Sequence, residues 1–125
     1  MKIRKAKKED YKSIIKLCEK HMGTILFPIP KCSKFMVAED KGKIVGCCAL
    51  EIYSPKIAEI RALVVDENYF GQSIGQMLVQ GCCQKGSGIK EIMVITGIPD
   101  YFKKLGFDFF QEEKFILFKK QKSKN

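Results

Sequence analysis

The sequence predicts one mixed α/β domain, in which a central, mostly antiparallel sheet is flanked by helices. Two observations carry this prediction. Strand-like and helical patterns alternate from Lys2 to Phe118 without a repeat or a linker, and residues 57–96 form a strand–helix–strand unit. The two strands of such a unit run parallel, because the helix crosses over the sheet in a right-handed sense. With 125 residues, 46% of them hydrophobic, the chain can bury one core and little more.

The first half of the chain is expected to form a strand, a helix, a loop and a meander. The helix ends at Gly23, because glycine adopts positive φ readily. Pro28 and Pro30 favour a loop or a short broken helix after it. The apolar face of the helix comprises Tyr11, Ile14, Ile15, Cys18 and Met22. The expected elements are a strand at 2–6, a helix at 7–22, and strands at 35–39, 43–53 and 57–65.

The second half continues the alternation of helix and strand. A helix at 71–85 ends near Gly86 and Gly88, and a buried strand follows. A short helix is closed by Gly106 before a final antiparallel pair of strands. The expected elements are a strand at 91–96, a helix at 99–105, and strands at 107–110 and 114–118.

The six cysteines are expected to be free thiols. Cys47 and Cys48 are adjacent, as are Cys82 and Cys83, and neighbouring residues on a strand point to opposite faces of the sheet. The chain has a single histidine and no C-x-x-C spacing, so no metal site is expected. Buried thiols are typical of a reducing compartment, and no signal peptide is recognisable at the start. Both observations favour the cytoplasm.

The charge distribution argues against two classes of partner. The net charge is +9, with part of the excess in residues 119–125, a basic tail after a domain of residues 1–118. Lysines interleave with acidic residues, and Arg4 and Arg61 are the only arginines, so a nucleic-acid-binding surface is not expected. No run of 18 apolar residues exists to span a membrane. A multiply phosphorylated small molecule remains a partner that such a charge would attract.

The loop after the strand at 57–65 has the features of a phosphate site. Gly71 and Gly75 lie where the loop opens a helix, and the first turn of a helix has backbone N–H groups without partners. The glycines let a ligand approach the backbone closely. Two glycines four residues apart are weak on spacing alone, and an ordinary strand-to-helix turn explains them equally.

Taken together, the motifs resemble those of the GNAT acyl-CoA N-acyltransferases. Residues 70–76 are similar to the family's Arg/Gln-x-x-Gly-x-Gly/Ala loop, and residues 99–107 resemble its aromatic-x-x-x-Gly-Phe helix end. Residues 59–61 and 96–102 are closest to the acetyltransferase domain of N-acetylglutamate synthases. The order of elements matches from residue 2 to about residue 118. The resemblance implies a GNAT fold and acetyl-CoA as co-substrate, with no metal.

The resemblance also implies where acetyl-CoA binds. Backbone groups of the strand would hold the pantetheine arm and steady the oxyanion, and the loop would hold the pyrophosphate. The loop departs from the family pattern at Phe70, where Arg or Gln is usual, and at Ser73, where glycine is usual. Ser73 is expected to be strained if its position requires positive φ. The implied donor-binding residues are Leu63, Val64, Val65, Phe70, Gly71, Gln72, Ser73, Ile74, Gly75 and Gln76.

Two charged residues at the start of the strand are candidates for catalysis and acceptor binding. Glu59 would help to remove the proton of the attacking amine, and Arg61 would receive a carboxylate of the acceptor. The alternative is an ion pair of Arg61 with Glu59 or Glu51 that has no catalytic role. Alternation along a strand places Glu59, Arg61, Leu63 and Val65 on one face, and Ala58, Ile60, Ala62 and Val64 on the other.

The family often places a tyrosine four residues before the Gly-Phe pair, to protonate the leaving thiolate. That position is Phe102 here, and the tyrosine is one residue earlier, at Tyr101. A helix turns about 100° per residue, so Tyr101 is expected to point elsewhere. Water would then supply the proton.

Three functions are weighed. The leading one is acetylation of a primary amine of a small molecule, for example an amino acid such as glutamate, by direct attack in a ternary complex. The second is a non-catalytic or weakly active GNAT-fold module that binds CoA or a protein partner. The third, nucleic-acid binding, is disfavoured by the scarcity of arginine and the lack of a stacking motif. A homodimer stays open.

Overall fold

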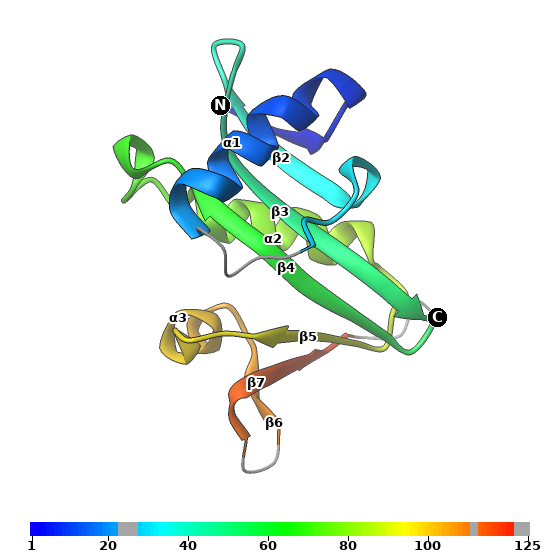
Figure 1. Ribbon diagram of the computed structural model, residues 1–125. Helices are drawn as coiled ribbons and strands as arrows, with labels where there is room; N and C mark the ends of the chain where they lie inside the picture. Colours follow the sequence, from blue (N-terminus) through cyan, green and yellow to red (C-terminus); the bar gives the residue numbers. More distant parts are fainter. Residues whose placement is uncertain (23–27, 111–112, 122–125) are drawn as a thin grey trace.

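The computed structural model shows a central sheet with helices on both of its faces (Figure 1). The structure describes residues 1–22, 28–110 and 113–121. Within these residues the strands are β1 (Lys2–Lys5), β2 (Phe35–Asp40), β3 (Lys43–Ser54), β4 (Ile57–Val65), β5 (Glu91–Ile95), β6 (Asp108–Phe110) and β7 (Glu113–Lys120). The α-helices are α1 (Tyr11–Met22), α2 (Ile74–Lys85) and α3 (Pro99–Lys104), with 3₁₀ turns η1 (Lys8–Asp10), η2 (Cys32–Lys34) and η3 (Glu67–Tyr69).

The sheet is mixed and mostly antiparallel. Its strand order is β1-β2-β3-β4-β5-β7-β6. Neighbouring strands are antiparallel except β4 and β5, which run parallel and are connected through α2. The predicted fold, a single α/β domain with a mostly antiparallel mixed sheet flanked by helices, is confirmed.

The ends of several elements differ from the prediction. The helix expected from residue 7 begins with the 3₁₀ turn η1, where the Asp10 carboxylate accepts a hydrogen bond from the Lys7 backbone N–H (2.6 Å). α2 begins three residues later than expected, at Ile74, because the preceding loop keeps its own conformation. The predicted helix end at Gly23 lies outside the described residues. In the β2–β3 turn, Lys41 and Gly42 both have positive φ (50° and 81°), as a tight hairpin requires.

Two helices cover opposite faces of the sheet, as Figure 1 shows for α1 in front and α2 behind. α2 packs on a core that includes Leu50, Ile60 and Leu78. α1 packs on a second core through Ile14 and Cys18, as predicted, and through Leu17, which the helical pattern did not single out; the rest of this core comprises Phe35, Val37, Ile44, Cys47, Ala49, Ala62 and Val64. No helix in the described ranges is both long and apolar enough to cross a membrane.

β4 contains a bulge at Ala62. This residue has a φ of 54°, a left-handed conformation that is unusual for a residue with a side chain. The register with β3 shifts at the same place: Arg61 lies opposite Ala49, whereas Val64 lies opposite Cys47. β4 therefore has one residue more than β3 in this interval, which defines a β-bulge.

The extra residue reverses which side chains face which helix. Before the bulge, Ala58 and Ile60 belong to the core under α2. After it, Ala62 and Val64 belong to the core under α1. The prediction that these four share one face is therefore wrong, because the period-two alternation does not survive a bulge. The companion prediction for Glu59, Arg61, Leu63 and Val65 is wrong for the same reason, since Leu63 and Val65 pack against the α2 side.

β7 extends beyond its predicted end and ties the end of the described chain to α2. Lys119 and Lys120, assigned from sequence to a basic tail, pair with β5 as part of β7. The Gln121 side-chain nitrogen then donates to the carbonyls of Gly86 (2.9 Å) and Ile89 (3.1 Å), just after α2. The ordered domain thus includes at least three residues beyond Phe118.

All six cysteines are free. Cys47 and Cys48 are fully buried on opposite faces of the sheet, one in each core. A hydrogen bond with Cys18, together with burial, raises the pKa of the Cys47 thiol well above its usual value. A hydrogen bond with Cys82, again with burial, does the same for the pKa of the Cys48 thiol. These thiols hold little thiolate at neutral pH and are poor nucleophiles.

We expect a chromogenic disulfide reagent to titrate all six thiols in denaturant without prior reduction, because none is paired. In the native protein, Cys47 and Cys48 should react far more slowly than half-buried Cys32, because they are inaccessible and protonated. Cys32→Ser should remove the fast phase and serves as the control. Fewer than six thiols in denaturant would contradict the expectation.

Candidate functional site

β4 pairs with β5 only over its own first half. Their parallel register runs from Ile57 opposite Glu91 to Ile60 opposite Val94. Beyond this point β4 passes through its bulge, and Figure 1 shows the two strands diverging towards α3. In the described part of the chain, β5 gives the second half of β4 no ladder partner. That stretch of backbone can therefore offer its N–H and C=O groups to a ligand.

Two adjoining cavities occupy this divergence. The first, of about 510 Å³, lies between the strands and is lined by both Glu59 and Arg61. The second, of about 640 Å³, lies between the end of β4, the loop that precedes α2, and α3. Leu63 and Ile98 line both cavities, so the two adjoin at these residues and together form a cleft region, with Glu59 and Arg61 in the first cavity.

The second cavity gathers most of the residues that the sequence assigns to the acyl donor. Two of the assigned residues, Gln72 and Gln76, are exposed and do not line it. The assigned residues that do line it are Leu63, Val64, Val65, Phe70, Gly71, Ser73, Ile74 and Gly75.

The loop before α2 requires positive φ at two positions. Gly71 has a φ of 83° and Ser73 a φ of 61°. Glycine adopts such a conformation freely, whereas a serine there is strained, which is the condition set out from the sequence for Ser73. The Ser73 side chain makes no capping hydrogen bond to α2, so the first-turn N–H groups stay available for an anion.

Side-chain hydrogen bonds brace the segment that leads into this loop. The buried Asp66 carboxylate accepts from the Asn68 backbone N–H (2.9 Å), which is the main reason why the pKa of Asp66 is lowered; Lys43, Lys20 and His21 add to this. The Tyr69 hydroxyl donates to Asp40 in the β2–β3 hairpin (3.0 Å). The segment is therefore held by one bond within itself and by one bond to β2 before the loop turns into the cleft.

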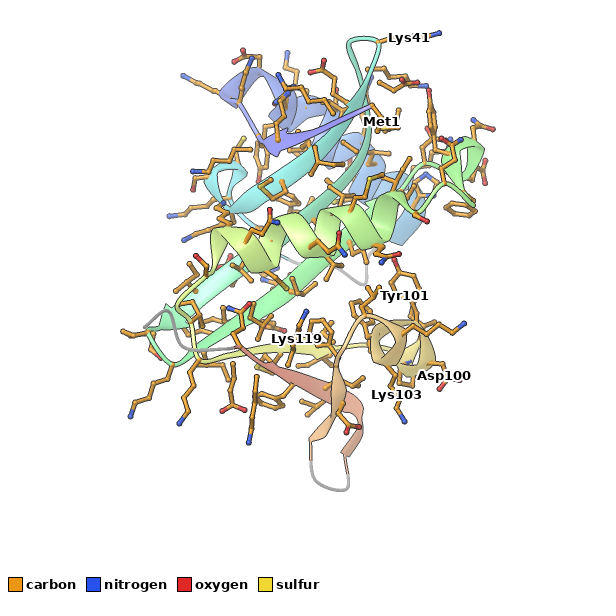
Figure 2. The ribbon with its side chains drawn as sticks, turned by 180° about the vertical axis from the view of Figure 1, so that it is seen from behind. Met1, Lys41, Asp100, Tyr101, Lys103 and Lys119 are labelled. Atoms are coloured by element: carbon orange, nitrogen blue, oxygen red, sulfur yellow. The ribbon has the colours of Figure 1, made fainter. Side chains whose placement is uncertain are left out.

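Tyr101 lines the second cavity, which corrects the expectation that it points elsewhere. Figure 2 shows its side chain extending from α3 towards the N-terminal end of α2. Its hydroxyl lies so close to Gly75 that a Cβ at this glycine would overlap with it. Burial raises the pKa of Tyr101. Phe102 instead packs edge-on against Phe107 in the core, 5.6 Å between ring centres.

Glu59 and Arg61 face the first cavity with different partners. The Tyr53 hydroxyl donates a short hydrogen bond to the Glu59 carboxylate (2.5 Å). Burial, followed by this bond, raises the pKa of Tyr53 to about 12, so the phenol stays protonated and remains a donor. The Arg61 guanidinium donates to the Pro28 carbonyl (3.2 Å).

The alternative reading of these charges, an ion pair, finds no support in the structure. Arg4 forms ion pairs with Asp10 and Glu39 (2.7 Å to each). Arg61 pairs with neither Glu59 nor Glu51. Glu59 and Arg61 are thus two separate polar groups in the wall of a cleft.

Several residues of the cleft could not be assigned to a functional site from the sequence, because no sequence pattern pointed to them strongly enough. His21 lines the second cavity from the last turn of α1, although it reads from the sequence as an ordinary helix-end residue. Ile98 is 61% exposed and lines both cavities. Tyr53 lies beside Glu59 because the β3–β4 hairpin pairs their strands. The hairpin pairing was the one available signal, since it brings Tyr53 and Glu59 near each other.

With this geometry established, comparison with known proteins defines the class of the chain. The acetyltransferase (GNAT) domain family matches residues 31–108. The chain therefore belongs to the GNAT acetyltransferase family. This confirms the resemblance drawn from the two motifs.

Two relatives by sequence and two solved structures are informative. An uncharacterized N-acetyltransferase of Chlorobaculum tepidum is 37% identical over 83 residues, which are 65% of this chain and 54% of the relative. This chain thus spans about half the length of that relative. An amino-acid acetyltransferase of Mycobacterium tuberculosis is 29% identical over 116 residues, covering 84% of this chain and 67% of the relative.

Among structures, a Mycobacterium tuberculosis protein in complex with CoA aligns with a TM-score of 0.82 and 28% identity, covering 89% of this chain and 74% of its own. The N-acetylglutamate synthase of Neisseria gonorrhoeae, complexed with coenzyme A and N-acetyl-glutamate, aligns with a TM-score of 0.83 over 95% of this chain and 34% of its own. Its identity of 20% shows the fold alone.

We expect Ser73→Gly to raise the free energy of unfolding by about 0.5–1 kcal/mol. The substitution relieves a left-handed conformation, which costs about 1–2 kcal/mol for a residue with a side chain, against the extra chain entropy of glycine. Chemical denaturation measures the change. Ser87→Gly, at an exposed turn position without positive φ, is the control and should give no gain. A loss of stability in Ser73→Gly would contradict the strain.

Proposed function

We propose that this protein transfers an acetyl group from acetyl-CoA to a primary amine of a small molecule, by direct attack in a ternary complex. The observation that carries the proposal is the pair of adjoining cavities where β4 leaves β5, one of them at a helix N-terminus and the other lined by a carboxylate. Family membership and the similarity to CoA-bound structures support acetyl-CoA as the donor. An amino acid such as glutamate is a candidate acceptor, supported by the names of the relatives.

The donor would lie along the second half of β4 and reach the loop before α2. Backbone groups of Leu63, Val64 and Val65, which β5 does not pair, would hold the pantetheine arm, and one N–H would stabilise the oxyanion. The loop residues 70–76 would hold the pyrophosphate through backbone N–H groups at the start of α2. Tyr101 closes this part of the cleft from α3.

Glu59 and Arg61 would act on the acceptor in the first cavity. An ammonium group must lose a proton before its nitrogen can attack a thioester, and Glu59 is a carboxylate in the cavity wall. The hydrogen bond from Tyr53 fixes the orientation of that carboxylate. Arg61 would bind an acceptor carboxylate. One guanidinium nitrogen donates to the Pro28 carbonyl, and the other N–H groups of the guanidinium are left to bind the carboxylate. Water would protonate the leaving thiolate.

A second function is a module that binds CoA or a protein partner with little or no turnover. The observation that favours it is the loop itself: Phe70 carries no charge and is 67% exposed, and Ser73 is strained. Both features would lower the affinity of the loop for a pyrophosphate without abolishing binding.

We expect acetyl-CoA to raise the melting temperature by several degrees, because a ligand at 100 times its Kd adds about 2.7 kcal/mol to the folded state. Gly75→Glu should abolish the shift, since its side chain would displace Tyr101 and place a negative charge where phosphate would lie. Gln80→Glu adds the same charge at an exposed position of α2 outside the cleft, and should keep the shift. An unchanged melting temperature at millimolar acetyl-CoA would exclude both proposed functions that use CoA.

Glu59→Gln should lower the acetylation rate by roughly 10²–10⁴-fold, the range typical of one general base. The deficit should shrink as pH rises, because the amine is then already deprotonated. The matched control is Glu51→Gln, which lies directly opposite on β3 and outside the cavity lining. Release of CoA, followed with a panel of amines, gives the rates. Equal, pH-independent losses in both variants would remove Glu59 from the chemistry.

A further inference from the structure

His21 has a buried side-chain atom without a partner. In the part of the chain that the structure describes, its Nε2 is the one side-chain nitrogen or oxygen found buried with no hydrogen bond. A buried polar atom left unpaired costs free energy, so native proteins pair nearly all of them. His21 also lines a cavity, so we infer that a bound ligand supplies the missing hydrogen-bond partner of Nε2.

The position of His21 identifies the part of the cleft that it serves. It is the penultimate residue of α1 and lines the second cavity, together with Val64, Gly71 and Ser73. It does not line the first cavity, where Glu59 and Arg61 lie. α1 and α2 pack on opposite faces of the sheet, so His21 and the N-terminus of α2 approach this cavity from different faces.

The chemistry of this cavity indicates the group that His21 would bind. Among the described residues that line it there is no lysine or arginine, and Phe70 at the start of the loop is apolar, so His21 is the one of them that can carry a positive charge. The loop offers backbone N–H donors and the walls are mainly apolar. A phosphate oxygen only accepts hydrogen bonds, and an imidazole N–H can donate one while adding charge.

We propose that His21 binds the phosphate-bearing end of the acyl donor: its imidazole turns so that Nε2, which is covered in this structure, donates a hydrogen bond to a diphosphate oxygen. This inference rests on the proposed use of acetyl-CoA and assigns one of its contacts. The diphosphate is then held from two faces of the sheet, by backbone N–H groups of the loop and by a side chain of α1. His21 supplies the cationic group that the loop lacks.

The first test compares two ligands by calorimetry: CoA, and S-acetylpantetheine, which lacks the diphosphate and the nucleotide. We expect His21→Leu to weaken CoA binding by about tenfold or more, the size of a lost charge-assisted hydrogen bond, and to leave S-acetylpantetheine affected by less than twofold. His21→Gln, whose amide can still donate, should recover part of the loss. Lys20→Gln, which removes a neighbouring charge outside this cavity, should have a small effect.

Two further readouts separate binding from a structural role. Without ligand, His21→Leu should raise the melting temperature, because it removes a buried unpaired atom, whereas a structural histidine would lower it. The chain has a single histidine, so its imidazole ¹⁵N signals are unambiguous in NMR spectra. CoA should shift the Nε2 signal more than S-acetylpantetheine does.

Other outcomes would overturn the inference. Equal losses of affinity for CoA and S-acetylpantetheine would make His21 a structural residue. A change confined to the Michaelis constant of the acceptor would show that His21 serves acceptor binding instead. CoA affinity that does not depend on His21 would overturn the contact while leaving the proposed transferase intact. Binding that depends on His21 without acetyl transfer would overturn the enzymatic function and keep the contact. Absence of CoA binding in the unmodified protein would overturn both.

Discussion

The left-handed backbone of Ala62 is the constraint on which the cleft depends. A residue with a side chain in this conformation costs about 1–2 kcal/mol, and it persists only where packing on both sides enforces it. Ala62 and Val64 are packed under α1, and Leu63 and Val65 against the α2 side. The bulge lets one strand line both cavities: Glu59 precedes it in the first cavity, and Leu63, Val64 and Val65 follow it in the second.

The cleft is electrostatically unlike the rest of the protein. The chain carries a net charge of +9, yet none of the described residues that line the cavity proposed for the donor is a lysine or an arginine. Attraction of a polyanionic donor would therefore come from the field of the whole surface, and its retention from backbone N–H groups and one imidazole. Salt screens long-range attraction far more than it weakens short hydrogen bonds inside a cleft. Added salt should therefore slow the association of the donor more than it speeds its dissociation.

Most of the fold could be predicted from the sequence, because its elements have clear periodicity and its turns carry glycine or proline. β4 has its predicted bounds, Ile57–Val65, and the loop of residues 70–76, predicted to hold phosphate, contributes to the lining of the second cavity. The bulge could not be predicted, because it falls on an alanine, a residue with no turn preference. Alternation was therefore assumed to continue through Ala62, and every later residue of β4 was assigned to the wrong face. Tyr101 was misjudged for a related reason: the family pattern fixes a position in sequence, whereas α3 is short and its orientation follows from packing.

The contacts of Gln121 bear on how the fold closes. β7 inserts between β5 and β6, so the penultimate strand of the sheet is contributed by the end of the described chain. Gln121 then joins this strand to the turn after α2, a connection between two segments 32–35 residues apart in sequence. Such a contact forms late on a ribosome, because one partner is synthesised long after the other. Until β7 pairs with β5, this edge of β5 stays open, and the nascent protein is exposed to pairing with the wrong strand.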